Sequence, residues 1–544
     1  MTTANIAATR QRTRPVVVLV VACLATFAIN LDTNLVNVAL PAFTRQLHAG
    51  TRDLQWIVDA YNLAFASLVL GAGGLGDRIG RRPLLVTGLV GFAAATGTGA
   101  LCTTPGQLVA VRLVMGVFAA MIFPTTLSVI ANAFPERAAR AKAIGVWGAV
   151  VGVGVAVGPV TGGLLLEHFW WGSVFLALVP VALVTAVLAY LLVPESRDPL
   201  APPVDRGGVV AACLMVGTLV YTIIEAPTRG WHGAATLGGF GVAAMFGLLF
   251  VTVERRAAHP MIDLSIFRTR AFSAASLSVT VAFFALFGFI FLVTQFFQFV
   301  RGYGPLSTGV RILPVAVSIA LGAALGPALV GRLGTRPVVM AGLTLLGCSF
   351  GWIALSPQGM SYHVIVGQMV VMGLGLGLTQ VPATDSILSV LPAAKAGVGS
   401  AVNDATREAG GTLGVAVVGS VYASIFASRL GTSDLARLPG PALDTARSSV
   451  GAALGVASQA GGGVYTAAVQ DSFMSAFHVG CLVGFGVCLL GALGALALPG
   501  RAIPAVISVD SALDRGIDRD HRCRDAAPAD RLVRPVTAEV QEIS

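Results

Sequence analysis

The sequence predicts an all-α polytopic membrane protein with fourteen transmembrane helices. Hydrophobic residues make up 55% of the 544 residues and charged residues only 11%. The apolar residues also gather in runs long enough to cross a bilayer, which requires about 20 apolar residues per helix. A soluble domain carries roughly 25% charged residues. The composition therefore excludes a globular protein with a single membrane anchor.

Apolar segments recur along the chain as far as residue 499. We place spans at 16–40, 54–75, 84–103, 106–133, 143–166, 173–193, 208–226, 234–253, 272–300, 308–330, 337–356, 362–391, 403–427 and 473–499. An even number puts both termini on one side of the membrane. Loops on that side carry nineteen Lys and Arg residues, against eight on the other, so both termini are expected to be cytoplasmic. This predicts a multi-pass protein of the plasma or inner cell membrane.

A short internal repeat divides the chain. Residues 75–83, LGDRIGRRP, match residues 329–337, LVGRLGTRP. Parallel repeats build many secondary transporters, with the substrate site between the halves. We expect two six-helix bundles related by a pseudo-two-fold axis, plus two extra helices between them. The predicted parts are a cytoplasmic tail (1–15), a six-helix bundle (16–193), a linker (194–207), two extra helices (208–253), a cytoplasmic loop (254–271), a second bundle (272–500) with a long extracellular loop (428–470), and a disordered cytoplasmic tail (501–544).

The fifth span contains the glycine-rich run GVWGAVVGVGVAVGPVTGG at 145–163. Glycines at 154, 158 and 162 share one helix face, which lets a second helix approach closely. Pro159 removes a backbone hydrogen bond and favours a bend. Plain helix packing would explain a lone glycine pair, but the full pattern predicts a face that packs against a helix of the other half. The motif comprises Gly145, Gly154, Gly158, Pro159, Gly162 and Gly163.

The loop after the second span reads GGLGDRIGRRP at 73–83, and we call it the latch loop. Glycines at 76 and 80 permit a tight turn, and Asp77 can accept hydrogen bonds from a helix N-terminus. Simple cationic anchoring to the membrane surface explains the arginines but not the aspartate. We therefore expect a latch that holds the two halves in one alternating state. Its residues are Gly73, Asp77, Arg78, Gly80, Arg81 and Arg82.

A few charged residues lie inside the predicted spans, where a charge is costly and is functional by default. Asp32 and Arg112 lie at comparable depths, and we expect both to face a central cavity. There Asp32 would bind a proton or a cationic substrate and Arg112 would tune it; a static ion pair is the alternative. Asp59 is a further candidate for the cavity wall, with a position at the outer surface equally open. Asp385 is a candidate as well, and whether it lines the cavity is left open.

Two other acidic positions favour different roles. Glu225 ends the seventh span and is expected to be interfacial rather than coupling. The group Asp404, Arg407 and Glu408 begins the thirteenth span, where a gate or loop network is favoured over coupling. Eight phenylalanines crowd 283–299, and most of them are expected to face lipid or packed helices, with a subset available to an aromatic substrate.

Several classes of function are disfavoured. Neither of the two lysines follows a glycine, so the chain has no P-loop, which requires Gly-Lys. The seven cysteines form no CxxC or His-linked metal spacing. We therefore expect no metal site, no cofactor and no nucleic-acid partner, and an ion gradient as the energy source. One charge moved across 100 mV yields about 2.3 kcal/mol.

Four motifs together resemble a known family. Besides the latch loop and the glycine run, the fourth span carries LVAVRLVMGVFAA (108–120) and the first carries LDTNLVNVALP (31–41). The chain is identified as a member of the major facilitator superfamily, in its fourteen-helix drug:proton antiporter branch. It departs from the family pattern at Asn34, Asp59, Met115 and Gly331.

The resemblance implies a proton-coupled exporter of amphipathic or cationic small molecules, such as antibiotics and dyes. It would work by rocker-switch alternating access, as a monomer in the lipid bilayer, and would take part in multidrug efflux and antibiotic resistance. Two alternatives remain: a dedicated exporter of one metabolite or lipid, and a membrane sensor or enzyme without transport. The chain carries no nucleophile-elbow or kinase motif, so we expect that it is not an enzyme.

Overall fold

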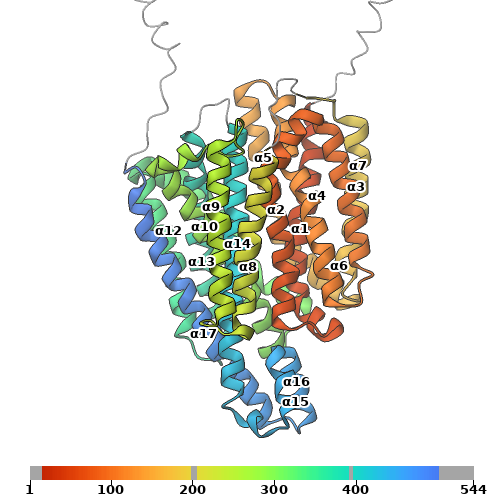
Figure 1. The fold of residues 1–544 in the computed structure, drawn as a ribbon, viewed down its shortest axis with the longest axis vertical. Helices are drawn as coiled ribbons and strands as arrows, with labels where there is room; N and C mark the ends of the chain where they lie inside the picture. Colours follow the sequence, from red (N-terminus) through yellow and green to blue (C-terminus); the bar gives the residue numbers. More distant parts are fainter. Residues whose placement is uncertain (1–14, 198–204, 391–395, 501–544) are drawn as a thin grey trace, which may run out of the picture. The chain divides into compact units, whose positions relative to one another are not determined.

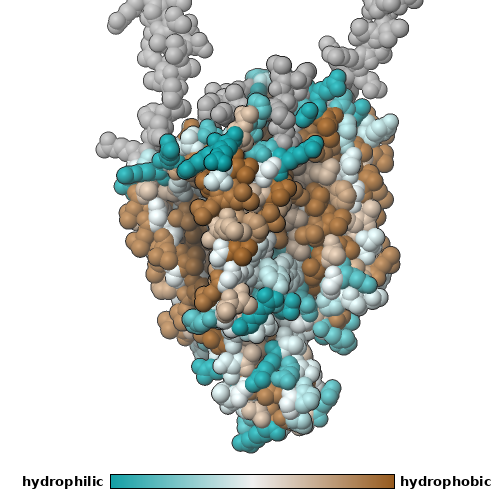
Figure 2. All heavy atoms as spheres, viewed as in Figure 1, coloured by the Kyte–Doolittle hydropathy of each residue, from teal (hydrophilic) through white to brown (hydrophobic). Residues whose placement is uncertain are grey.

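The computed structural model describes residues 15–197, 205–390 and 396–500. Every regular element in these ranges is helical (Figure 1), and thirteen of their helices are long and apolar enough to cross a membrane. On the face that Figure 2 shows, apolar side chains cover the middle of the bundle and hydrophilic ones gather toward both of its ends. Residues 1–14 of the predicted tail 1–15, the whole tail 501–544 and half of the linker (198–204) lie outside the described residues.

The first part of the chain forms seven helices where six spans were predicted. They are α1 (Pro15–Leu47), α2 (Thr51–Ile79), α3 (Arg81–Gly99), α4 (Pro105–Ala133), α5 (Arg137–His168), the short α6 (Ser173–Leu176) and α7 (Leu178–Leu192). Thr104 caps the start of α4, because its side-chain hydroxyl accepts a hydrogen bond from the backbone amide of Gln107. α3 overlaps the predicted third span but is not among the thirteen helices that are apolar enough to cross a membrane. Its two arginines at the start and its Thr and Gly residues at the end lower its mean hydropathy.

The remaining long helices follow the predicted order. They are α8 (Arg206–Arg229), α9 (Ala234–Arg256), α10 (Arg270–Gln295) with a π-helical turn η2 (Phe296–Val300), α11 (Pro305–Leu333), α12 (Thr335–Ala354), α13 (Tyr362–Ser389), α14 (Ala396–Leu430) and α17 (Val464–Gly494). The phenylalanine-rich α10 is the most buried span. Its rings therefore lie mainly against other helices rather than against lipid.

The internal repeat has a structural counterpart. α2 packs on α4 and α3 on α7, as α11 packs on α13 and α12 on α17. Gly80 and Gly334, at equivalent positions, have φ of 115° and 90°, which glycine adopts without a Cβ penalty. After each glycine the backbone is hydrogen-bonded to the segment that follows the last helix of the same half. The Arg81 backbone amide donates to the Ser196 carbonyl, and the Arg336 backbone amide donates to the Pro499 carbonyl.

The two sets of helices meet along two seams, α2 with α14 and α5 with α11. The extra helix α8 packs against both α2 and α14, and α9 packs on α8. In Figure 1 this pair lies between the red-to-orange first half and the green-to-blue second half. We call the end where α1 begins the N-terminal side, and the end where α1 finishes the far side.

The segment predicted as one long loop, 428–470, is largely helical, which corrects that prediction. After α14 the chain forms η4 (Asp434–Arg437), α15 (Gly440–Ser448) and α16 (Val450–Gln459). Ser449 caps α16 by accepting from the Ala452 amide. The physical reason is the segment's Ala, Val and Leu content: Leu435, Val450 and Ala453 are buried, so the helices gain an apolar contact that a loop would lack.

Candidate functional site

Two charged side chains from different helices form an ion pair in the bundle interior. Arg112 Nη1 of α4 lies 2.5 Å from Asp32 Oδ2 of α1. The side chains are 1% and 0% exposed, so water screens neither charge. Removing one partner of a buried pair leaves the other charge uncompensated, at a cost of about 3–5 kcal/mol. The position of Asp32 and Arg112 is therefore one where gain or loss of a proton has large consequences.

Arg112 has two further partners, both on α2. Its Nε donates to the Ile57 carbonyl at 3.0 Å, and its guanidinium carbon lies 4.2 Å from the centre of the Tyr61 ring. A cation over an aromatic face is attracted by the ring quadrupole. Tyr61 was not among the predicted site residues, although a polar aromatic side chain two residues from the intramembrane Asp59 was an available signal.

The structure corrects the expectation that Asp32 and Arg112 face the central cavity. A pocket between the halves, which we call the N-side pocket, has Tyr61 on its wall, and neither member of the ion pair lines it. Tyr61 thus lies between the ion pair and the pocket. The pocket is lined by Ile29, Asn30, Thr33, Tyr61, Phe65, Phe123, Asp404, Arg407 and Glu408.

The charged group on α14 lies at the same pocket. Asp404, Arg407 and Glu408, predicted to form a gate or loop network, all lie on the wall of the N-side pocket, and the gate role stays a prediction. Arg407 Nη1 is 3.8 Å from Asp404 Oδ1, and its guanidinium lies 4.5 Å from the Phe283 ring centre. The pocket therefore has two carboxyl groups and one cation on the side that faces Tyr61, a combination suited to a cationic ligand.

The other predicted acids are distributed differently. Asp59 is fully buried, and both its oxygens lack a hydrogen-bond partner among the described residues. It neither lines the N-side pocket nor reaches the surface. Asp385 is exposed near the N-terminal side, apart from that pocket. Glu225 is buried and pairs with Arg52 of α2 at 2.6 Å and with Arg229 at 3.7 Å; its position at the membrane interface stays a prediction.

The glycine stripe of α5 packs within its own half, which corrects the predicted contact with the other half. A Cβ at Gly154 or Gly162 would lie 3.0 Å from Asn30 or Leu35 of α1, and one at Gly158 would overlap Asn34. Three glycines thus bring α5 against α1. The rotation of α5 about its axis decides this contact. The α5 residues that face the second half lie on a different side of the helix from Gly154, Gly158 and Gly162.

Other residues of the same motif reach the second half, at its far side. A Cβ at Gly163 would lie 2.6 Å from the Leu306 Cα, and Gly309 of α11 lies against the Pro159 carbonyl. Gly145, on the N-terminal side of α5, has nothing within 4 Å of its Cβ position. The α5–α11 seam is therefore closed toward the far side and open toward the N-terminal side.

Two buried glutamines complete this closure and were missed by the sequence analysis. Gln55 of α2 donates to the Ala416 carbonyl of α14 at 3.0 Å, and Gln298 of η2 donates to the Val38 carbonyl of α1 at 3.0 Å. Arg45 donates to the Gln298 amide oxygen at 3.2 Å. Each contact joins the two halves. Because a buried amide inside a span is costly without a partner, both glutamines carried a detectable signal.

In this arrangement the latch loop makes its contacts within the first half, and its role in holding the two halves in one alternating state stays a prediction. Asp77 pairs with Arg81 at 2.8 Å, and Arg82 with Glu195 beyond α7 at 3.3 Å. A Cβ at Gly80 would overlap Glu195. Gly73 lies near Pro124, and Arg78 is exposed. The loop thus clamps α2 and α3 to the end of α7 in the present arrangement, where the halves are apart on the N-terminal side.

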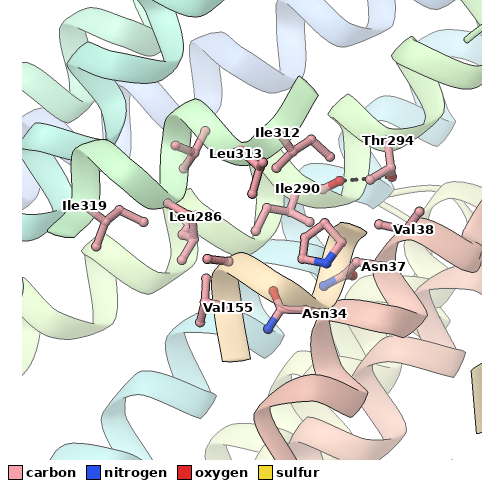
Figure 3. A pocket seen from close by; sticks show the side chains of 14 residues that line it. Asn34, Asn37, Val38, Val155, Leu286, Ile290, Thr294, Ile312, Leu313 and Ile319 are labelled. Carbon is pink, nitrogen blue, oxygen red and sulfur yellow. Dashed lines mark hydrogen bonds between the residues drawn. The ribbon is translucent and has the colours of Figure 1, made fainter. Parts of the chain in front are cut away.

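A second pocket lies at the α5–α11 seam, and we call it the seam pocket (Figure 3). Its walls are apolar apart from the two amides and one hydroxyl contributed by Asn34, Asn37 and Thr294. It is lined by Asn34, Asn37, Val38, Val155, Ala156, Pro159, Leu286, Ile290, Thr294, Ile312, Leu313, Val315, Ala316 and Ile319. Among the described residues no group of three or more His, Cys, Asp or Glu side chains could hold a metal ion.

The sequence is similar to proteins of one transport family. A family model for the Major Facilitator Superfamily matches residues 22–415. The chain is 35% identical to multidrug efflux pump LfrA of Mycolicibacterium smegmatis, over 91% of this chain and 97% of LfrA. It is 32% identical to the tetracenomycin C resistance and export protein of Streptomyces glaucescens, over 89% and 92%.

A solved structure supports the fold. The bacterial homologue of the human lysosomal transporter Spinster, in an inward-facing and unoccupied conformation, aligns with a TM-score of 0.64. The alignment covers 90% of this chain and 99% of that one, at 16% identity. At this identity the likeness concerns the fold alone, and it agrees with the packing described above.

Proposed function

Because the chain belongs to the Major Facilitator Superfamily, we propose that it exports amphipathic, cationic small molecules in exchange for protons. Relatives named as multidrug efflux and drug export proteins, at 32–35% identity over most of the chain, support the substrate class. The observation that carries the coupling is the buried Asp32–Arg112 pair behind Tyr61, at the border of a pocket that also holds two acids.

The ion pair provides a physical means of coupling. When Asp32 takes up a proton, its attraction to Arg112 is lost, and the guanidinium keeps only the Ile57 carbonyl and the Tyr61 ring. A cationic substrate near Asp404 and Glu408 adds a positive charge on the other side of that ring. Substrate and proton thus oppose each other through Tyr61, as exchange requires. Asp59, which is buried and has no hydrogen-bond partner among the described residues, is a second candidate for a proton.

The proposed architecture is a fourteen-span transporter that works by rocker-switch motion. α3 would be the fourteenth span, with α1–α7 and α10–α17 as the two six-span halves and α8 and α9 as the additions. The repeated packing and the two glycine turns support this arrangement.

The charge bias of the loops supports cytoplasmic termini in the plasma membrane. In that orientation the present arrangement is open to the cytoplasm. We propose that the protein acts as a monomer.

Purified protein in proteoliposomes tests the proposal. With ethidium as substrate and an internal pH dye, we expect substrate-dependent proton movement with the wild type. Asp32→Asn should abolish proton movement and reduce uphill transport at least tenfold. The matched control is Asp434→Asn, which removes a half-exposed acid of the far side that pairs only with the exposed Arg437 among the described residues and should change nothing. Normal export by Asp32→Asn with unchanged stoichiometry would show that the coupling site is elsewhere.

A further inference from the structure

Two carboxyl groups meet where the extra helix α8 begins and α9 ends, away from the ion pair and both pockets. Asp205 precedes α8, and its Oδ1 accepts a hydrogen bond from the Gly208 amide at 2.8 Å. Glu254 lies in the last turn of α9, and its Oε2 accepts from the Ile262 amide at 3.2 Å. Each carboxyl group therefore uses one oxygen to hold backbone, at the start of α8 and in the segment after α9.

The second oxygen of each carboxyl group points into the same space. Asp205 Oδ2 and Glu254 Oε1 are buried and have no hydrogen-bond partner among the described residues. A Cβ on Gly208 would lie 2.8 Å from Asp205 Oδ2 and 2.5 Å from Glu254 Oε1, so the two free oxygens meet directly over this glycine. Glu254 is only 3% exposed, and water therefore screens its charge little.

No cation among the described residues pairs with these two acids. The neighbouring basic groups along the chain are all exposed and form no ion pair with either carboxyl group: Arg206, Arg255, Arg256, His259, Arg268 and Arg270. Asp263, also exposed, caps η1 (Leu264–Arg268) by accepting from the Ser265 amide. On the helices packed against α8, the charged groups nearest this level are exposed, paired or directed at the N-side pocket: Asp77, Arg78, Asp404, Arg407 and Glu408. Two ionised carboxylates in one buried space repel each other, which favours the protonated form of one of them.

A metal ion suits this space less well than a proton. Ca²⁺ takes about 6–8 oxygen ligands, and Mg²⁺ requires near-octahedral geometry, whereas two free oxygens are present here. The backbone groups that contact the carboxyls are the amides of Gly208 and Ile262. These amides donate hydrogen bonds and cannot bind a cation.

We propose that Asp205 and Glu254 form a proton-binding site, in which one proton is shared between Asp205 Oδ2 and Glu254 Oε1. The shared hydrogen bond fastens the start of α8 to the end of α9 and, through the Ile262 amide, to the segment that leads into α10. The folded protein thus holds this proton more tightly than the unfolded chain does. The stabilisation is present in acidic and neutral solution and is lost as the pH rises and the proton leaves, because the two carboxylates then repel.

Infrared spectroscopy tests for the proton directly, since a protonated carboxyl group has a carbonyl stretching band that a carboxylate lacks. When the full-length protein in proteoliposomes is taken from neutral to alkaline pH, we expect part of this band to disappear. Asp205→Asn and Glu254→Gln should each abolish that part. Asp32→Asn should retain it, which separates the shared proton from the coupling proton. The control is Glu136→Gln, at an exposed glutamate whose side chain caps no helix, and it should also retain it.

Hydrogen exchange of the backbone amides in 257–264 reports on the fastening itself. In Glu254→Gln the side-chain oxygen can still accept from Ile262, and the amide nitrogen can donate to Asp205 Oδ2, with no proton to lose. At neutral pH the wild type and this variant should therefore be equally protected. At alkaline pH protection should fall at least tenfold in the wild type and persist in the variant.

Three results would overturn the proposal. The first is an infrared change that neither acid variant abolishes, and the second is wild-type protection that does not depend on pH. The third is restoration of wild-type protection at alkaline pH by added Ca²⁺ or Mg²⁺, which would make the pair a metal site. None of these measurements depends on transport, so the proposal and the proposed export function can fail separately.

Discussion

Replacing Gly309 by alanine perturbs the closure of the far side directly. The added methyl group would overlap the Pro159 carbonyl oxygen. That atom belongs to the backbone and cannot rotate away, so α5 and α11 must move apart. Overpacking a tight contact costs about 1–3 kcal/mol. Only the arrangement with the far side closed bears this cost, so the substitution favours the opposite one.

The expected size follows from the two-state equilibrium. A cost of about 2 kcal/mol changes the ratio of the two populations by about 30-fold, since about 1.4 kcal/mol is tenfold. Gly145→Ala is the matched control, because its methyl group meets nothing within 4 Å. Both changes raise helix propensity by about 1 kcal/mol. This gain is common to the two arrangements and cancels in their ratio.

Distances between spin labels measure the shift. Leu101 and Leu355 are 78% and 86% exposed on loops of the first and second halves, so cysteines there report on separation at the far side, in a background that lacks the exposed Cys348. We expect a short distance for the parent protein, a dominant longer one with Gly309→Ala, and no change with Gly145→Ala. Identical distributions for the two glycine variants would refute the reasoning.

Three further substitutions test other contacts. Arg112→Lys keeps the charge but loses the geometry of the Ile57 and Tyr61 contacts, so ethidium efflux in proteoliposomes should fall at least tenfold; unaltered efflux would mean that charge alone suffices. Gly80→Ala places a side chain at φ of 115° and should destabilise the protein by about 1–3 kcal/mol, seen as a lower thermal midpoint; an unchanged midpoint would contradict the clamp at the latch loop. Arg52→Gln removes the nearer partner of the buried Glu225 and leaves only Arg229 at 3.7 Å, so the thermal midpoint should fall; an unchanged midpoint would show that this pair does not hold α8 against α2.

The helical spans and the repeat were predictable because both depend on local pattern. Apolar runs of fixed length can satisfy their backbone groups in a membrane only as helices, and the paired loop motifs at 75–83 and 329–337 mark equivalent turns. The rarity of intramembrane charge also singled out Asp32 and Arg112. Their pairing was left open, because two charges at similar depth on different helices can face each other or a cavity.

The partners of each helix face were not predictable in the same way. Small residues show that Gly154 and Gly158 permit a close approach, but which helix approaches depends on the rotation of α5 about its axis. The N-side pocket raised the same difficulty, since Tyr61 and Glu408 come from helices that are far apart in the chain. The helices α15 and α16 were missed because their length is below that of a span and their packing partners are distant in sequence.

The sequence by itself determined the membrane class, the helical segments, the repeat and the identity of the costly charges, since each follows from composition, spacing or the price of burying a charge. Tertiary structure alone decided that Asp32 and Arg112 are closed behind Tyr61, that the latch loop contacts one half, and that α8 packs against both α2 and α14. These depend on the rotation and tilt of packed helices. A small turn of a helix changes which side chains meet and leaves the pattern of the sequence unchanged.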